Sequence, residues 1–215
     1  MALTQRVPVF PLGTVLFPET PIHLHIFEPR YQKMARRILE EKAGFVVSLI
    51  KTGQEALGSL ASPHSVGTIA RIHSKEDLAE GRMNIVAFGE ERVRISAVEE
   101  HKDGYLEADA EILPFRDALS AETMDGAGLL RQNAEEYFQI LRAIKNTDSF
   151  DLPRPGTGLI FLCSAALPVP VSERQGFLES GSLAFLARDL AERYAHYIHL
   201  MQAGQADMAG SSHLN

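Results

Sequence analysis

Apolar and polar residues alternate along several short segments in the first half of the chain. The alternation is strictest at residues 106–112, where Glu107, Asp109 and Glu111 occupy one face. A period of two is typical of half-buried strands, and a continuous apolar run is typical of a fully buried strand. The predicted strands are 22–26, 45–50, 83–87, 93–97 and 106–112. Their close spacing indicates a small barrel or a compact sheet.

Two glycine-containing turns and one helix connect these strands. Glu80-Gly81 and Asp103-Gly104 each separate two strand patterns, which predicts two hairpins. A helix is predicted to start at Pro29, which suits a first helical turn, and to end near Gly44. Its buried stripe would consist of Tyr31, Met34, Ala35 and Ile38.

After Pro114 the spacing of apolar residues becomes helical. Residues 130–144 and 183–201 each show one apolar face, and residues 158–167 are apolar on nearly every side. Ser172 and Gln175 match a capping box and predict the start of a further helix. We therefore expect an α+β fold in which four helices form a bundle. The predicted domains are 1–115 and 116–203, followed by a flexible tail at 204–215.

Composition is that of a folded globular protein, with 45% hydrophobic and 23% charged residues among 215. Cys163 is the single cysteine, which excludes an intrachain disulfide and fits a reducing compartment. We expect it to be a buried, unreactive thiol. The first residues show no secretory signal, and the most apolar stretch is interrupted by Pro168 and Pro170. These features predict a soluble, cytoplasmic protein with no membrane partner.

Charge argues against a nucleic-acid partner. The formal net charge is −7, and no basic stripe is present that could displace counterions from phosphates. The densest cationic group is predicted to be a solvated helix face, balanced by the nearby Glu40 and Glu41. This group comprises Arg30, Lys33, Arg36 and Arg37.

Sequence motifs for catalysis are missing. The sequence contains no phosphate-binding P-loop, no dinucleotide fingerprint, no nucleophile elbow and no H-E-x-x-H zinc motif. We therefore predict no catalytic residue, no cofactor and no enzymatic activity. Two histidine pairs, His23 with His25 and His196 with His199, have spacings that a metal could use. The first pair has no third ligand nearby in sequence. The second pair has Glu192 one turn earlier, but helix surfaces show this spacing by chance, so no metal site is predicted.

The most distinctive segment is residues 7–34, which reads VPVFPLGTVLFPETPIHLHIFEPRYQKM. It resembles the N-terminal domain of the Lon protease family, whose hallmark is P-L-x-x-x-L-F-P followed by I-F-E-P-R-Y. Further matches are V-G-T-I-A-R-I at 66–72, G-R-M-N-I at 81–85, R-V-R-I at 92–95 and R-Q-G-F-L-E at 174–179. The resemblance covers about residues 6–202. Glu19 departs from it, because the family commonly has a glycine after L-F-P.

The resemblance implies a PUA-like β-barrel with an inserted helix, followed by a C-terminal helical bundle. It implies a substrate-binding module, here expected to stand alone without the ATPase and protease modules. A protease label would therefore rest on homology only. The motif residues either hold the fold or contact a ligand, and both readings stay open. They are Phe17, Pro18, Phe27, Glu28, Pro29, Arg30, Tyr31, Gly67, Arg71 and Gly89.

Polypeptide binding is the leading functional hypothesis. Protein or peptide segments would contact an exposed apolar surface, and the chain would act as an adaptor that delivers them to a separate protease. The predicted surface comprises Phe10, Leu12, Phe17, Phe27 and Tyr31, unless these residues belong to the core. Two alternatives remain: binding of RNA or a modified nucleotide, by analogy with other PUA-like barrels, and an unrecognised small-molecule enzyme. The sequence predicts neither the oligomeric state nor the partner's identity.

Overall fold

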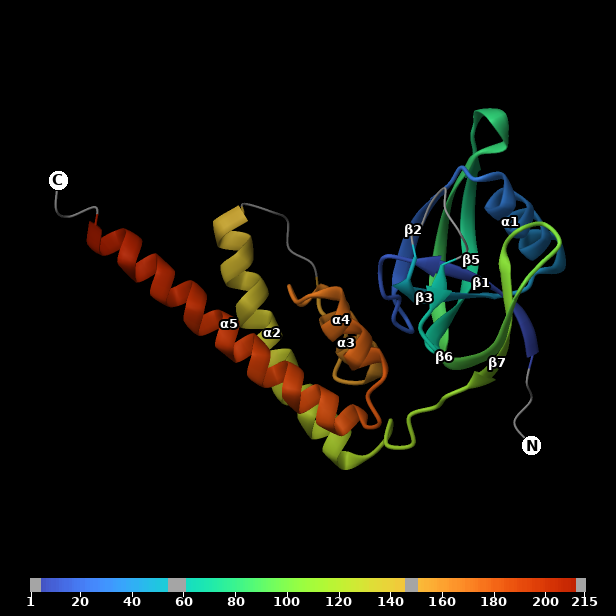
Figure 1. Cartoon of the computed structure of the whole chain (residues 1–215). Coiled ribbons are helices and arrows are strands. Elements are labelled where there is room, and N and C mark those ends of the chain that lie inside the picture. Colours follow the sequence, from blue (N-terminus) through green and yellow to red (C-terminus); the bar gives the residue numbers. More distant parts are fainter. Residues whose placement is uncertain (1–4, 54–60, 146–150, 212–215) are drawn as a thin grey trace. The chain divides into compact units, whose positions relative to one another are not determined.

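The computed structural model describes residues 5–53, 61–145 and 151–211, with side chains up to residue 203. The chain divides into two compact units (Figure 1). Unit 1 comprises Met1–Pro114 and Pro168–Glu179, and unit 2 comprises Phe115–Leu167 and Ser180–Asn215. No helix in the described part of the chain is both long and apolar enough to cross a membrane.

A seven-stranded mixed sheet forms most of unit 1. Its strands are β1 (Gln5–Leu12), β2 (Pro21–Ile26), β3 (Phe45–Thr52), β4 (Ser62–Pro63), β5 (Val66–Asp77), β6 (Met83–Glu100) and β7 (Leu106–Ile112). The pairings run β1–β7–β6–β5–β3 and return through a parallel β1–β3 pair. β2 pairs with β6, and β4 pairs with β3, so two strands lie outside this circuit. The predicted mixture of strands and helices is confirmed, whereas the PUA-like barrel stays a prediction.

Both predicted hairpins are present, because β5 and β6 flank Glu80-Gly81 while β6 and β7 flank Asp103-Gly104. Two apolar residues of these alternating patterns, Ala97 and Ile112, are exposed rather than buried. Ala97 is exposed, because the register of β6 against β7 shifts between Ser96 and Glu99 and Ala97 has a φ of 47°. Such a bulge turns the side chains that follow it away from the strict alternation. Ile112, at the end of β7, is 53% exposed.

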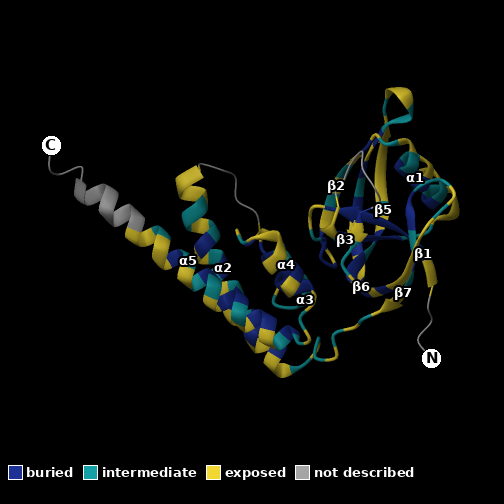
Figure 2. Cartoon of the chain, in the orientation of Figure 1, coloured by how far each residue is buried: buried dark blue, intermediate teal, exposed yellow. Residues whose placement is uncertain are grey.

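Helix α1 (Pro29–Glu41) packs against the sheet through the predicted stripe. Tyr31, Met34, Ala35 and Ile38 are all buried, as the spacing required. Figure 2 shows buried, intermediate and exposed stretches along the α1 ribbon. The helix ends where Lys42 adopts a left-handed conformation, with a φ of 49°. The Lys42 N–H donates to the Ile38 carbonyl oxygen, so this residue satisfies one of the last orphan groups of the helix.

The described residues of unit 2 form three helices: α2 (Ala121–Lys145), α3 (Thr157–Ala166) and α5 (Leu183–Ser211). The predicted helical segments are therefore confirmed. Gly126 of α2 permits close approach to α5, since a Cβ there would lie 3.1 Å from Ala187 Cβ. The α5 backbone continues to Ser211, past Gly204 where the tail was predicted to start, and residues 212–215 lie outside the described part.

Helix α4 (Val171–Leu178) belongs to unit 1, although the sequence grouped it with the helical domain. Gln175 Nε2 donates to the Val66 carbonyl oxygen at 3.0 Å, and Arg92 Nη1 donates to the Leu178 carbonyl oxygen at 2.9 Å. The predicted capping box is wrong as well. Pro170 is the N-cap and Ser172 lies inside the helix, so the Gln175 amide is available to bind the sheet.

Candidate functional site

A tight turn at residues 17–20 leads the chain from β1 into β2. The Phe17 carbonyl oxygen accepts the Thr20 N–H at 3.3 Å and the Thr20 hydroxyl at 2.8 Å. Pro18 in the second position and Glu19 in the third, with a φ of 60°, match the pattern of a type II turn. That third position favours glycine, which explains physically why Glu19 is a departure from the family pattern.

The turn also fixes how β2 meets β6. The Glu19 N–H donates to the Gly89 carbonyl oxygen at 2.8 Å, and the Gly89 N–H donates to the Thr20 carbonyl oxygen at 3.0 Å. Glu19 and Thr20 therefore both oppose Gly89, which is the arrangement of a β-bulge. From there β2 runs antiparallel to β6, pairing from Pro21 with Phe88 to Ile26 with Met83.

A pocket of about 400 Å³ lies between β2 and the end of β1. Its lining is mostly apolar and includes a consecutive stretch of the chain from His23 to Glu28. The other lining residues are Phe10 and Leu12 of β1 and Tyr31 of α1. Phe10 and Tyr31 stack with their ring centroids 4.1 Å apart.

The structure corrects the predicted exposed apolar surface. Phe10, Leu12 and Tyr31 are only 3–6% exposed and form walls of the pocket. Phe17 is fully buried and does not line the pocket, since its carbonyl group belongs to the turn. Phe27 is the member that reaches solvent, at 47% exposed. Four of the five residues therefore line one pocket. They form a recess with one exposed aromatic residue, Phe27, beside it, and not the exposed surface that was predicted.

An ion pair forms the corner between β2 and α1. Arg30 Nε and Nη2 lie 3.0 and 2.9 Å from Glu28 Oε2, and both side chains are largely shielded from solvent. The Arg30 guanidinium also lies 4.7 Å from the centre of the Tyr31 ring. Pro29 occupies the first helical turn, as predicted. Gln32 Nε2 donates to the Phe27 carbonyl oxygen at 2.9 Å and completes the corner.

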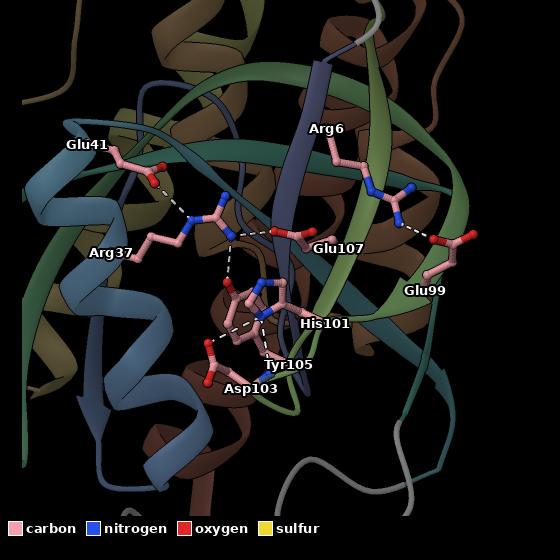
Figure 3. Close-up of polar contacts among 8 residues, drawn as sticks. All are labelled: Arg6, Arg37, Glu41, Glu99, His101, Asp103, Tyr105 and Glu107. Atoms are coloured by element: carbon pink, nitrogen blue, oxygen red, sulfur yellow. Dashed lines mark hydrogen bonds and ion pairs between the residues drawn. The ribbon is translucent and has the colours of Figure 1, made fainter.

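Two cations on the predicted solvated face of α1, Arg37 and Lys33, bind the β6–β7 hairpin, and we call these contacts the α1 clamp. Figure 3 shows the contacts of Arg37. Arg37 forms the expected pair with Glu41, but its Nη1 also donates to the Tyr105 hydroxyl at 2.8 Å and to Glu107 at 2.7 Å. These bonds, to Tyr105 first, raise the pKa of Arg37, so the guanidinium stays charged. Lys33 pairs with Asp103 at 3.1 Å and lowers the pKa of that carboxyl group. The clamp thus holds α1 to the β6–β7 hairpin.

Two glycines of the family motif are required by close packing. A Cβ on Gly89 would overlap the Phe17 carbonyl oxygen, and a Cβ on Gly67 would lie 2.6 Å from the Val47 carbonyl oxygen. Real side chains essentially never approach backbone this closely. Arg71 bridges two segments, since it pairs with Glu90 and its Nη1 donates to the Lys42 carbonyl oxygen at 2.7 Å. These contacts favour a role in the fold for all three residues.

The histidine pairs lie outside any metal-ligand cluster. Among the described residues, no three His, Cys, Asp or Glu side chains gather where they could hold a metal ion. His25 Nδ1 lies 2.8 Å from Asn84 Oδ1, and the Asn84 amide donates to Glu76 at 3.0 Å. His196 and His199 are exposed on α5. Burial raises the pKa of Cys163 to about 12, which disfavours the thiolate form.

Comparison with known proteins gives consistent results. The sequence model of the ATP-dependent protease La (LON) substrate-binding domain matches residues 6–202. The chain is 27% identical over 180 residues to Lon protease 2 of Syntrophobacter fumaroxidans, covering 82% of this chain and 22% of that protein. It is 26% identical over 195 residues to Lon protease 1 of Bdellovibrio bacteriovorus, covering 87% and 24%. The chain thus spans less than a quarter of the length of these relatives.

Solved structures show the same fold. A Lon N-terminal domain protein from Xanthomonas campestris superimposes with a TM-score of 0.62 at 21% identity, covering 86% of this chain and 96% of that one. The N-terminal domain of the Mycobacterium avium complex Lon protease gives 0.63 at 17% identity, covering 89% and 98%. At these identities the similarity concerns the fold alone.

Proposed function

The chain belongs to the family of Lon substrate-binding domains, and from this premise we propose that it binds polypeptide segments in the pocket between β1 and β2. The observation that carries the proposal is the composition of this pocket. Phe10, Leu12, Leu24, Ile26 and Tyr31 provide apolar walls, and Phe27 lies exposed beside them. Burial of apolar side chains from a partner is the main favourable term in such binding.

Charge near the pocket supports a polypeptide over a nucleic acid. Arg30 is paired with Glu28, Lys33 with Asp103, and Arg37 with Glu41 and Glu107. A phosphate backbone would have to displace these carboxylates before it could use the cations. The RNA alternative therefore receives no support from the site, and the family description names a substrate-binding rather than a catalytic module.

The test is a binding titration of an extended, apolar-rich fluorescent peptide by anisotropy. Phe27→Ala should weaken binding about tenfold, because it removes an exposed aromatic contact at the pocket. Phe185→Ala is the matched control, since Phe185 of α5 is 71% exposed and belongs to unit 2. It should leave the affinity unchanged. Loss of binding in the control but not in Phe27→Ala would refute the assignment of this pocket.

Ionic strength separates the two ligand classes in the same assay. Apolar binding should change little between low and physiological salt. A labelled single-stranded RNA should bind weakly at low salt and not at physiological salt, because phosphate contacts release counterions. Tight RNA binding at physiological salt, with no binding of the peptide, would refute the polypeptide proposal.

An adaptor role extends the proposal. The chain would carry bound segments to a separate protease, so it should accelerate degradation of a destabilised model protein when added to a Lon protease. Phe27→Ala should abolish the acceleration. An unchanged degradation rate with wild-type chain would leave polypeptide binding intact and refute the adaptor role.

A further inference from the structure

We propose that β2 receives the bound polypeptide as an added β-strand, held by main-chain hydrogen bonds to His23 and His25. This inference rests on the proposed function, because it specifies how a polypeptide would lie in the pocket. It names the substrate class as an extended segment with apolar residues at every second position.

Hydrogen bonding at the bulge establishes which groups of β2 point outward. The Gly89 N–H donates to the Thr20 carbonyl oxygen, so Gly89 directs its main-chain groups toward β2. In an antiparallel pair this direction alternates from residue to residue. The register then directs the main-chain groups of Ile22, Leu24 and Ile26 toward β6. Those of the residues between them, His23 and His25, point to the opposite edge.

Two further observations agree with this direction. Pro21 falls in the outward phase, where its missing N–H costs no ladder bond. Within the described part of the chain, β2 pairs with β6 and with no other strand. The outward N–H and C=O groups of His23 and His25 are therefore available to a strand that the described part of the chain does not supply. The edge ends at Phe27, whose carbonyl oxygen already accepts Gln32.

The pocket runs along this edge. Six consecutive residues from His23 to Glu28 line it, although neighbouring side chains of a strand point to opposite faces. Consecutive residues can all border one recess when the recess lies beside the strand. On its far side are Phe10 and Leu12, beyond Val9, which is the last residue of β1 paired with β7. Phe10 and Leu12 still pair with β3, so the recess is bounded by the outer edge of β2 and by two residues of β1 that lie beyond its pairing with β7.

An added strand would place its alternate side chains in two different surroundings. One set would face Phe10, Leu12 and Tyr31, which are apolar and buried. The other set would lie beside His23, His25 and the exposed Phe27, whose ring stacks on His25 at 5.9 Å. The first set must be apolar, while the second tolerates polar residues. This is the period-two pattern of a strand with one buried face.

Charge selects among such segments. Among the residues that the structure describes, Glu28 is the one Asp, Glu, Lys or Arg that lines the pocket, and Arg30 neutralises it. A neutral apolar segment matches this lining, and the chain's net charge of −7 disfavours a strongly acidic one. The occupant we infer is thus a neutral or basic extended polypeptide with apolar residues in one phase.

The test on the protein side removes one outward N–H. His25→Pro deletes this donor at an edge position that tolerates proline, and His25→Ala deletes the same imidazole but keeps the donor. We expect His25→Pro to bind the apolar-rich peptide at least about tenfold more weakly than His25→Ala. Thermal melts of both variants should overlap. Equal affinity of two equally stable variants would overturn strand addition.

The test on the peptide side uses N-methylation and does not depend on protein stability. A short peptide of Leu and Phe alternating with Thr is made in two forms, each methylated on alternate backbone nitrogens in one phase. Strand addition uses the N–H groups of one phase only, so one form should lose binding about tenfold or more while the other retains it. Both forms have the same composition and the same number of methyl groups.

The outcomes separate this inference from the function on which it rests. No binding of the unmethylated peptide would refute the proposed function. Binding of all three peptides with equal affinity would preserve that function and overturn strand addition. A second copy of the chain is the other possible strand donor. Sedimentation that shows a dimer in wild type and in His25→Ala, but a monomer in His25→Pro, would assign the edge to self-association and overturn the proposal.

Discussion

Residues 7–34 contain two corners of the chain, and different kinds of interaction hold them. The turn at residues 17–20 is held by backbone hydrogen bonds and seated against Gly89, with Phe17 and Pro18 buried. The corner at residues 27–31 contains a shielded ion pair, an exposed aromatic ring and part of the pocket wall. One family motif thus combines a part that fixes the path of the chain with a part that borders the proposed binding pocket.

The largest effect should come from the first corner. Gly89→Ala places a methyl group on the Phe17 carbonyl oxygen, which is backbone and cannot rotate away. We expect unfolding free energy to fall by about 3 kcal/mol, the upper range for overpacking. Chemical denaturation measures it. Gly176→Ala is the control, because its Cβ meets nothing within 4 Å and it should change stability by less than about 1 kcal/mol.

A substitution at the second corner, residues 27–31, should lower the unfolding free energy by a smaller amount. Arg30→Ala removes the partner of Glu28 and the contact with the Tyr31 ring, and should destabilise the chain by about 1.5 kcal/mol. In the Glu28→Gln background the same substitution should cost less, since the carboxylate is gone. A double-mutant cycle by denaturation gives the coupling. Additive costs would mean that the pair does not hold the corner.

Relief of backbone strain in the turn at residues 17–20 should raise the unfolding free energy, by a smaller amount than the losses above. Glu19→Gly removes a side chain from a position with a φ of 60° and should stabilise the chain by about 0.5–1 kcal/mol. The peptide affinity should not change, because Glu19 does not line the pocket. A shift in thermal midpoint measures the gain. Glu122→Gly, in the first turn of α2, should have the opposite sign.

Acid should produce the smallest effect, at the clamp of α1. The hydrogen bond from Lys33 is the main cause that holds the pKa of Asp103 below its ordinary value of 3.8. A lowered folded-state pKa contributes stability above the ordinary value, and that stability is lost as the pH falls through the lower folded value. Thermal melts between pH 5 and pH 2.5 should therefore show a steeper acid loss in wild type than in Asp103→Asn. Parallel curves would contradict the pairing.

Local patterns predicted much of the fold. The stripe Tyr31, Met34, Ala35 and Ile38 follows from 3.6-residue spacing, and both hairpins follow from their glycine turns. The position of α4 could not be predicted, because Gln175 binds Val66, 109 residues earlier in the chain. Nothing in the local sequence around Ser172 distinguishes a capping serine from an exposed helical one.

The sequence grouped four of the residues that line the pocket, but it did not predict the pocket's form. Phe10, Leu12, Phe27 and Tyr31 were grouped by sequence proximity to the motif, and the pocket brings them together. Phe17 was included wrongly, because a backbone turn rather than a surface uses it. The edge of β2 that no other described strand pairs with was missed altogether. Alternation around His23 and His25 predicts a strand, but strand pairing depends on distant segments, so the free edge leaves no local signal.

The assignment of α4 to unit 1 has a consequence for cooperativity. Its two ends continue into α3 and α5, which contact each other within unit 2. A helix tethered at both ends that comes off the sheet stays at high effective concentration and rebinds without the entropy loss of a free segment. Arg92, at 5% exposed, donates to the Leu178 carbonyl oxygen at 2.9 Å, and we expect the two tethers to return this acceptor to it after local opening. A fragment ending at residue 115 would lack this acceptor of Arg92, and α4 added as a separate peptide would have to bind with the full entropy loss of a free segment.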